Sequence, residues 1–152
     1  MTSTVILLAE DNPNDEELTL RALRKYNVSN EVVVVRDGQE ALNYLFCAGE
    51  HASRNSNQQP QVILLDINLP KVNGLEVLKR IRADKRTHTL PVVMLTSSAE
   101  ERDRFAAYEN HANSYIQKPV DFDQFTEAVR HLGLYWLVLN QPPPAPRSAN
   151  GR

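Results

Sequence analysis

The sequence predicts an α/β fold in which one parallel β-sheet is covered by helices on both faces. Four short segments are continuous runs of apolar residues rather than alternating patterns, which is expected of strands buried on both faces. Segments with the three-to-four-residue spacing of amphipathic helices follow these runs. Five strand–helix pairs in succession favour a doubly wound sheet in a single domain of 152 residues.

The expected strands follow from the apolar runs. They are residues 5–9, 32–35, 62–65 and 92–95, with a weaker fifth segment at 114–116. The expected helices lie between and after them, at residues 13–26, 38–47, 74–83, 99–110 and 122–139. Asn12 before Pro13 offers a side-chain cap and a proline at the first helical position. Asp121 with Gln124 fits a capping box for the last helix.

Two polar stretches interrupt this alternation. Residues 48–59 are rich in Ser, Asn and Gln, so we expect an exposed loop after the second helix. Residues 141–152 are rich in proline and polar residues, so the folded domain is expected to span 4–140 and to precede a disordered tail. The four histidines, His51 among them, lack acidic or cysteine partners at metal-ligand spacing and are expected at the surface.

The composition excludes several classes of protein. With 41% apolar residues, 24% charged residues and a net charge of -2, the chain resembles a soluble globular protein and does not favour nucleic acid as a direct partner. No segment approaches the roughly twenty apolar residues that cross a bilayer, and the start lacks a basic signal-peptide segment, so we expect a cytoplasmic protein without membrane contact. The single cysteine, Cys47, excludes an internal disulfide.

Three carboxylates are expected to meet at one edge of the sheet. Glu10 and Asp11 follow the first strand, and Asp66 ends the third, where open α/β sheets keep their ligand sites. Like charges at close range are unfavourable, and a hard divalent cation such as magnesium, with oxygen ligands, relieves them. The sequence therefore predicts a metal site with Asp66 placed as a nucleophile.

The neighbouring strand ends add a hydroxyl and a cation. Thr96 ends the fourth strand, and Lys118 follows the fifth. A carboxylate nucleophile, a divalent metal, a hydroxyl donor and an ammonium are the groups that phosphoryl transfer to an aspartate requires. Each residue taken singly has an ordinary interpretation as a cap, a turn, a strand or a surface residue, but those interpretations do not explain their convergence.

These strand-end residues resemble the signature of response-regulator receiver domains. The resemblance implies a flavodoxin-like five-stranded sheet of order 2-1-3-4-5 with five helices. It implies that Asp66 is the phosphoacceptor, that Asp11 ligates Mg²⁺ or Mn²⁺ directly, and that Glu10 acts mainly through a bound water. Asn68 would add its main-chain oxygen to the metal.

The resemblance also implies roles for the other groups. Lys118, joined to Pro119 by a cis bond, would neutralise one phosphoryl oxygen, and Thr96 would donate its hydroxyl to another. Tyr115 matches the aromatic switch residue, whose ring fills the space that the threonine vacates, so that the surface near the last helix changes. Such a protein is a phosphoacceptor with slow self-dephosphorylation rather than a turnover enzyme.

A narrower resemblance is to the stand-alone receivers that accept phosphate from cyanobacterial phytochrome-type histidine kinases. It rests on residues 10–15, the 48–59 stretch, residues 66–70 and the apolar end of the last helix. It implies a phytochrome-type kinase as partner. It also implies an output through contact with another protein, whose identity the sequence does not indicate.

The last helix suggests a homodimer built on strand five and helix five. Its final turns carry four apolar residues outside the stripe that faces the core: Leu134, Tyr135, Leu137 and Val138. We expect these residues to form the dimer interface. The alternative is that the proline-rich tail covers them.

Two other functions use a similar sheet. A magnesium-dependent phosphatase with an aspartyl-phosphate intermediate places a second aspartate two residues after the nucleophile, and here that position is Asn68. A phosphate-independent binding module or flavin carrier is the other alternative, although no Gly/Ser/Thr-rich phosphate loop follows the first strand.

Overall fold

The sheet has the predicted architecture. In this computed structural model, residues 5–24, 31–97 and 112–134 are described. Their strands are β1 (Val5–Ala9), β2 (Glu31–Val35), β3 (Val62–Asp66), β4 (Val92–Thr96) and β5 (Ser114–Gln117). All neighbouring strands are parallel, in the order β2-β1-β3-β4-β5. The predicted doubly wound α/β fold and its strand order are therefore confirmed.

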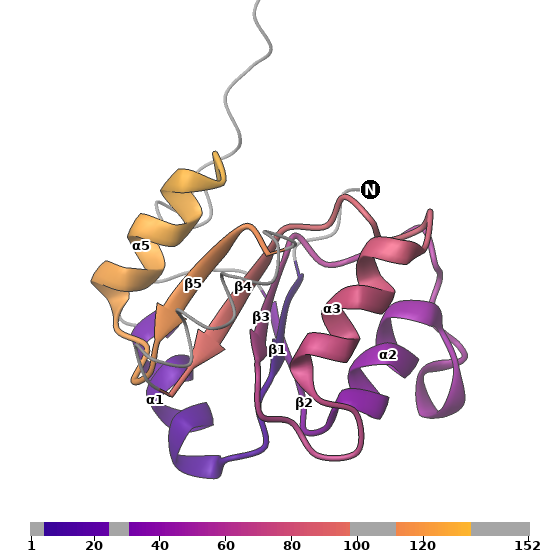
Figure 1. Cartoon of the computed structure of the whole chain (residues 1–152), viewed down its shortest axis with the longest axis horizontal. Coiled ribbons are helices and arrows are strands. Elements are labelled where there is room, and N and C mark those ends of the chain that lie inside the picture. The colour runs from indigo at the N-terminus through magenta and orange to yellow at the C-terminus, as the bar shows by residue number, and fades with distance from the viewer. Residues whose placement is uncertain (1–4, 25–30, 98–111, 135–152) are drawn as a thin grey trace, which may run out of the picture.

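Helices cover both faces of this sheet (Figure 1). They are α1 (Pro13–Arg24), α2 (Gly38–Phe46), α3 (Gly74–Ala83) and α5 (Phe122–His131), with a short 3-10 helix, η1 (Gly49–His51). The helices α2 and α3 lie side by side on one face, and α1 and α5 pack on the other. The helix expected at residues 99–110 lies outside the described residues.

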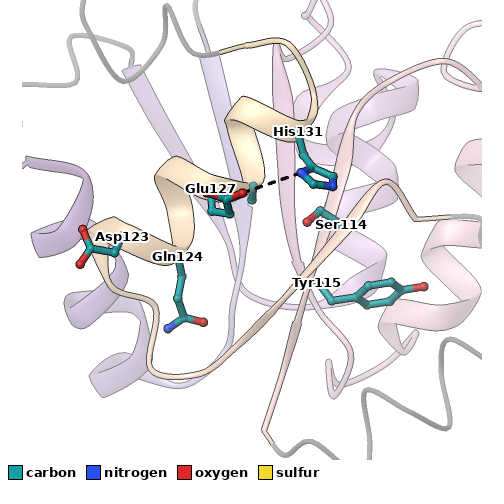
Figure 2. A pocket seen from close by; sticks show the side chains of 7 residues that line it. Ser114, Tyr115, Asp123, Gln124, Glu127 and His131 are labelled. Atoms are coloured by element: carbon teal, nitrogen blue, oxygen red, sulfur yellow. Dashed lines mark ion pairs between the residues drawn. The ribbon is translucent and has the colours of Figure 1, made fainter.

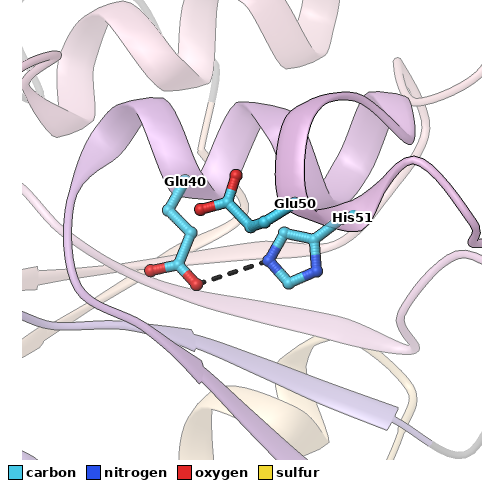
Figure 3. Close-up of side chains that lie close together, drawn as sticks. All are labelled: Glu40, Glu50 and His51. Atoms are coloured by element: carbon cyan, nitrogen blue, oxygen red, sulfur yellow. Dashed lines mark hydrogen bonds and ion pairs between the residues drawn. The ribbon is translucent and has the colours of Figure 1, made fainter.

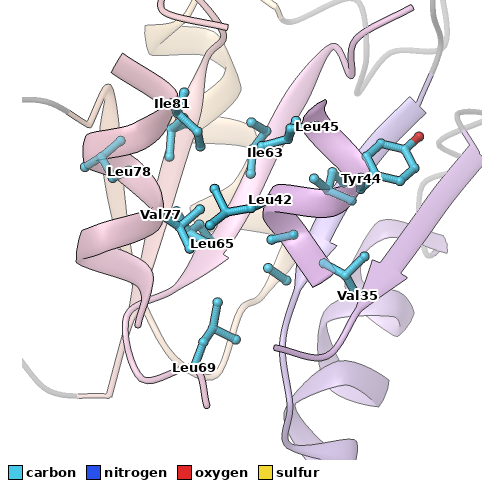
Figure 4. Close-up of a cluster of buried hydrophobic side chains, with 14 of the residues drawn as sticks. Val35, Leu42, Tyr44, Leu45, Ile63, Leu65, Leu69, Val77, Leu78 and Ile81 are labelled. Carbon is cyan, nitrogen blue, oxygen red and sulfur yellow. The ribbon is translucent and has the colours of Figure 1, made fainter. Parts of the chain in front are cut away.

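Successive residues of the central strands contribute to two separate cores. Leu7 and Ile63 belong to the cluster under α2 and α3 (Figure 4), whereas Ile6 and Leu64 belong to the cluster under α1 and α5. This division follows from the alternation of side chains along a strand, and it explains why the strands are apolar without interruption. All five residues of β3 are buried.

The predicted helix starts are also confirmed. The side chain of Asn12 accepts hydrogen bonds from the backbone N–H groups of Asn14 and Asp15, at 2.8 and 3.0 Å. Asp121 accepts from the backbone N–H of Gln124 at 2.8 Å. Because these caps satisfy free N–H groups of the first helical turn, the strand-to-helix turns above the sheet edge are fixed locally.

The last helix ends earlier than we predicted. It stops at His131, not at residue 139, and Gly133 adopts a left-handed φ of 74°. The backbone N–H of Gly133 donates to the carbonyl of Arg130, and that of Leu134 donates to the carbonyl of Val129, at 3.0 and 2.7 Å. This pair of bonds is the Schellman termination, which favours glycine at this position.

The segment 48–59 is mostly exposed, as predicted, but it is folded onto α2 rather than being a simple loop. The guanidinium of Arg54 lies 3.8 Å from the centre of the Tyr44 ring. The side chain of Gln59 donates to the carbonyl of Leu45 at 2.9 Å. His51 is half-buried against Tyr44, so its predicted surface position is wrong in part.

Within the three described ranges, no helix has the length and apolar character that crossing a membrane requires. The tail expected at residues 141–152 lies outside those ranges.

Candidate functional site at the carboxyl edge of the sheet

The polar residues predicted from the strand ends meet at one edge of the sheet. Glu10 and Asp11 directly follow β1, Asp66 is the last residue of β3, Thr96 is the last residue of β4, and Lys118 directly follows β5. These strands are neighbours in the sheet and run in the same direction, so their carboxyl ends lie together. The predicted convergence is confirmed.

The three carboxylates form a crowded and largely buried cluster. Glu10, Asp11 and Asp66 each present an oxygen, and these oxygens lie within 4.8 Å of one another. Glu10 is 0% exposed and Asp66 is 2% exposed, whereas Asp11 is open to solvent. Burial of neighbouring anions is unfavourable unless a cation or a proton compensates their charge.

The protonation of Glu10 reflects this crowding. Burial, followed by the charge of Asp66 and a hydrogen bond with it, raises the pKa of Glu10 from 4.5 to about 8, although Lys118 opposes the shift. When no metal ion is present, the carboxyl of Glu10 therefore holds a proton more tightly than an exposed glutamate does. A divalent cation at this position would displace that proton.

The ammonium of Lys118 faces the cluster. The Nζ atom of Lys118 lies 3.0 Å from Asp66 Oδ2, 3.3 Å from Glu10 Oε1 and 2.9 Å from Asp15 Oδ2. Burial lowers the pKa of Lys118, but hydrogen bonds to Asp15 and Asp66, together with the charges of Asp66 and Glu10, outweigh burial and raise it above its usual value. Lys118 is therefore charged in the folded protein. Its bond to Pro119 is cis, as the resemblance implied.

The backbone after β3 is held closely against the phosphoacceptor candidate. The backbone N–H of Asn68 donates to Asp66 Oδ1 at 3.2 Å, and that of Gly74 donates to the Ile67 carbonyl at 2.8 Å. A Cβ at position 74 would lie 2.2 Å from the carbonyl oxygen of Asp66, so only glycine allows α3 to begin there. The Asn68 contact orients the Asp66 carboxylate, and the Gly74 contacts fix the backbone that carries it.

Thr96 carries a buried hydroxyl that has no hydrogen-bond partner among the described residues. Its side chain is 0% exposed. A buried hydroxyl without a partner is costly, and the hydroxyl of Thr96 is free to donate a hydrogen bond to an oxygen that reaches the end of β4. The oxygen of a transferred group at Asp66 would be such an atom.

Tyr115, the predicted switch residue, lies on β5. Its ring points away from α5 (Figure 2) and packs against the core under α2 and α3, where burial raises the pKa of its hydroxyl. On the α5 side of β5 there is an open pocket of about 420 Å³. Its lining comprises Ser114, Tyr115, Asp123, Gln124, Glu127, Ala128 and His131.

Of the four residues predicted to form the dimer interface, Leu134 is among the described residues. Leu134 is half-buried and packs against the core under α1 and α5, after the helix has ended. Tyr135, Leu137 and Val138 lie outside the described residues. Leu134, the described member of the predicted dimer interface, therefore lies beyond the end of α5 and not on a helical surface.

Sequence reasoning missed Asp15. This residue lies in the first turn of α1 and makes an ion pair of 2.9 Å with Lys118. A signal was present, because α1 begins directly after β1 and its first turn is therefore held above the strand ends. The prediction considered only residues next to the strands.

The donor set suits a hard divalent cation. Carboxylate oxygens close together, one of them solvent-accessible, are ligands that Mg²⁺ and Mn²⁺ favour. The ammonium of Lys118 contacts the Asp66 carboxylate, and Thr96 ends the neighbouring strand β4, so both groups can donate hydrogen bonds to an oxyanion at this edge. The arrangement can therefore support transfer of an anionic group to Asp66.

Comparison with known proteins gives a consistent result. Residues 6–130 match the family model described as "Response regulator receiver domain". A solved structure of the bacteriophytochrome response regulator RtBRR is 53% identical, with a TM-score of 0.85, and the match covers 95% of this chain and 86% of that one.

Two further relatives have been characterised structurally. The phosphorylated cyanobacterial phytochrome response regulator RcpA is 40% identical with a TM-score of 0.71, and the match covers 95% of this chain and all of that one (100%). Response regulator Rcp1 of Synechocystis is 37% identical over 88% of each chain. The structure of its Mn(2+)-bound form gives a TM-score of 0.70 and 36% identity, covering 93% of this chain and 99% of that one.

Proposed function

This chain belongs to the response regulator receiver family, and on that premise we propose that Asp66 is the residue that accepts the phosphoryl group. The chain has the phosphoacceptor signalling role of its family, and its relatives include phytochrome response regulators. The position of Asp66 at the end of the central strand, in contact with the ammonium of Lys118 and next to the strand that ends in the buried Thr96, supports this assignment.

One observation carries the proposal most directly. The Asp66 carboxylate lies 3.0 Å from the ammonium of Lys118, on the same edge as the unpartnered hydroxyl of Thr96. Both groups are hydrogen-bond donors, and only one of them has an acceptor in the described part of the chain. A phosphoryl group on Asp66 would supply oxygens to both.

We further propose that Mg²⁺ supports the transfer. Glu10, Asp11, Asp66 and the main-chain oxygen of Asn68 would hold the ion. When bound, the ion would neutralise charge on the phosphoryl oxygens. Receiver domains bind divalent metal ions. The solved structure of the Mn(2+)-bound form of Rcp1 supports the proposal that this chain has a divalent-metal site too.

In the proposed step, an oxygen of Asp66 attacks phosphorus and forms the new P–O bond. The P–N bond of a phosphohistidine breaks, its electron pair stays on the imidazole, and the imidazole takes a proton from water. With acetyl phosphate, a P–O bond breaks and acetate leaves with the electron pair. Lys118 and Thr96 donate hydrogen bonds to the phosphoryl oxygens as their charge increases.

The protein is proposed to be a signalling acceptor rather than a turnover enzyme. A phosphatase of this chemistry uses a second carboxylate two residues after the nucleophile, and this chain has Asn68 there. Water that attacks the phosphoryl group then has no carboxylate general base at that position. We expect slow release from Asp66.

The proposed donor is a phytochrome-type histidine kinase, and the proposed compartment is the cytoplasm. Receiver domains interact with histidine kinases, and RtBRR and RcpA are phytochrome response regulators. The proposed output is a protein contact at the β5–α5 face, where Tyr115 and the open pocket lie. A homodimer through that face is the contact we expect first.

Incubation with acetyl phosphate and Mg²⁺, followed by intact mass spectrometry, tests the central assignment. We expect one phosphoryl group on the wild-type chain and none on Asp66→Asn. Asp84→Asn is the matched control. Asp84 lies outside the site, and its carboxylate is paired with Arg86 at a distance of 3.0 Å. Incorporation into Asp66→Asn would contradict the assignment, multiple turnover would support the phosphatase, and no incorporation would support a binding module.

Two measurements test the proposed partners. Phosphotransfer from a panel of purified histidine kinases should be fastest from phytochrome-type kinases, and equal rates across the panel would refute that preference. Sedimentation with and without a phosphoryl analogue should show a dimer. A monomer at tens of micromolar (roughly the range where weak interfaces still associate) under both conditions would remove the dimer proposal.

A further inference from the structure

Asp15 makes the shortest contact of the Lys118 ammonium among the described residues. Its Oδ2 atom lies 2.9 Å from Lys118 Nζ, compared with 3.0 Å for Asp66 and 3.3 Å for Glu10. Asp15 and Lys118 are 103 positions apart in the sequence, so the fold brings them together. This contact is not part of the strand-end pattern from which the site was predicted.

The ammonium has no spare hydrogen bond in the unphosphorylated protein. It carries three N–H donors and faces three carboxylates, from Glu10, Asp15 and Asp66. The Lys118 side chain is 10% exposed, so water has little access to it. A phosphoryl oxygen can therefore receive a hydrogen bond from Lys118 only if one of these carboxylates gives it up.

The geometry of α1 holds Asp15 in place. The Asn12 side chain accepts the backbone N–H of Asp15 at 3.0 Å and fixes the first helical turn. The Asp15 side chain is 28% exposed, so it is more solvated than Glu10 or Asp66. It keeps its negative charge close to the site but outside the predicted metal ligands.

We propose that Asp15 restrains Lys118 and thereby slows phosphoryl uptake at Asp66. This inference rests on the proposed function of Asp66. In the resting protein, Asp15 competes with the phosphoryl group for the ammonium. It also adds one negative charge beside the path of an anionic phosphodonor, and both effects oppose uptake. Asp15 is thus a positioning residue that acts through Lys118.

The substitution Asp15→Asn isolates the charge. Asparagine has nearly the same shape and keeps an oxygen acceptor near Lys118, but it removes the ion pair. Because partly exposed ion pairs contribute modestly, we expect uptake from acetyl phosphate to become about fivefold faster. The concentration of beryllofluoride that half-saturates the protein should fall by a similar factor, because that equilibrium also depends on Lys118 being released.

Glu17→Gln is the matched control. Glu17 lies on the same helix, and its side chain pairs with Arg21 and Arg24 rather than with Lys118. The substitution changes the net charge of the protein by the same amount. Uptake by Glu17→Gln should stay within about twofold of wild type, since the charge is remote and screened. An equal acceleration in both variants would show a general charge effect and overturn the inference.

A double-mutant cycle separates action through Lys118 from a direct effect of Asp15. In the Lys118→Gln background, uptake is slow but can be followed over long incubations by mass spectrometry. There, Asp15→Asn should change the rate by less than about twofold, because the partner of Asp15 is gone. A fivefold acceleration in that background would overturn the inference.

The remaining outcomes are also decisive. If the wild type takes up no phosphoryl group, the proposed function fails and the inference fails with it. If the wild type is phosphorylated and Asp15→Asn matches it or is slower, only the inference fails. Thermal unfolding of both variants checks their folding, and Asp15→Ser, which also removes the charge, replaces Asp15→Asn should that variant be unfolded.

Discussion

Two groups of side chains in the described residues have the composition of a metal site, and they differ in how their charges are satisfied. One is the strand-edge cluster of Glu10, Asp11 and Asp66. The other, which we call the helix-two cluster, consists of Glu40, Glu50 and His51 (Figure 3).

The helix-two cluster is satisfied by its own surroundings. Glu40 Oε1 accepts the backbone N–H of Arg36 at 3.1 Å, and Glu40 Oε2 lies 3.3 Å from His51 Nε2. Glu50 accepts from the Asn43 side chain at 2.9 Å. These partners are close in sequence and partly open to water. The cluster therefore stabilises the fold of residues 48–59 and leaves little charge to compensate.

The strand-edge cluster is the opposite case. Two of its carboxylates follow β1 and the third ends β3. Glu10 and Asp66 are buried, and the ammonium of Lys118 pairs with both of them and with Asp15. The raised pKa of Glu10 reports the charge that remains uncompensated. The comparison teaches that reactivity follows from unsatisfied charge, and that proximity of suitable ligands alone does not indicate a site.

Substitution should have the largest effect at Gly38, where the start of α2 packs against the loop that follows Asp66 and donates a backbone hydrogen bond to the Pro70 carbonyl at 3.1 Å. A Cβ there would lie 1.7 Å from the carbonyl oxygen of Val72, in the loop that leads from Asp66 to α3. We expect Gly38→Ala to destabilise the protein by about 3 kcal/mol and to weaken phosphoryl uptake. Urea unfolding measures the first effect. The control is Gly133→Ala, which has free space and should cost about 1 kcal/mol for its positive φ alone. Equal losses would contradict the packing argument.

The second-largest effect is expected from Mg²⁺, which should bind the strand-edge cluster and not the helix-two cluster. At one hundred times the dissociation constant, the ion should stabilise the wild type by about 2.7 kcal/mol. Glu40→Gln should keep this gain, whereas Glu10→Gln should lose most of it. Thermal unfolding with and without Mg²⁺ measures the difference. A loss of the gain in Glu40→Gln would show that the helix-two cluster binds the ion.

In metal-free protein, the strand-edge cluster should also produce a pH dependence of stability. The folded-state pKa of Glu10 is about 8 and its reference value is 4.5, so the folded protein binds more protons between these values. Stability should therefore fall as pH rises through this interval, by up to about 1.4 kcal/mol per pH unit. Denaturation of wild type and Glu10→Gln in the presence of a chelator isolates this contribution. Parallel profiles for the two proteins would contradict it.

The smallest effect is expected at the helix-two cluster itself. His51 packs edge-on against Tyr44, with ring centres 5.1 Å apart, and faces Glu40. His51→Ala should cost about 1 kcal/mol or less, because the pair is partly exposed. Phosphoryl uptake should not change. Slower uptake in this variant would mean that the two clusters are coupled more strongly than their separate partners indicate.

Much of the fold and the edge site was predictable because both follow from short-range patterns. Continuous apolar runs gave the strands, and the parallel sheet brought Asp66, Thr96 and Lys118 together without knowledge of any side-chain contact. The helix end at His131 was also encoded locally, by Gly133, but the apolar residues beyond it favoured a longer helix. Apolar spacing was given more weight there than the glycine termination.

Contacts made by side chains across the fold were not predictable in this way. Asp15 and Lys118 meet only because the first turn of α1 and the end of β5 share one edge. His51 lies within reach of Glu40 because the 3-10 helix folds back onto α2. Neither relation appears in residue spacing, since both depend on how the connecting segments turn.

The position of Lys118 late in the chain determines when, during synthesis, the phosphorylation site becomes complete. Lys118 reaches Glu10 across 108 positions of the chain. A nascent chain that has folded its first three strands holds the carboxylates but lacks the ammonium, and it acquires the complete site only when β5 docks. Phosphoryl transfer that depends on Lys118 is therefore slow on an unfinished chain, so rapid phosphorylation requires folding to have reached the last strand.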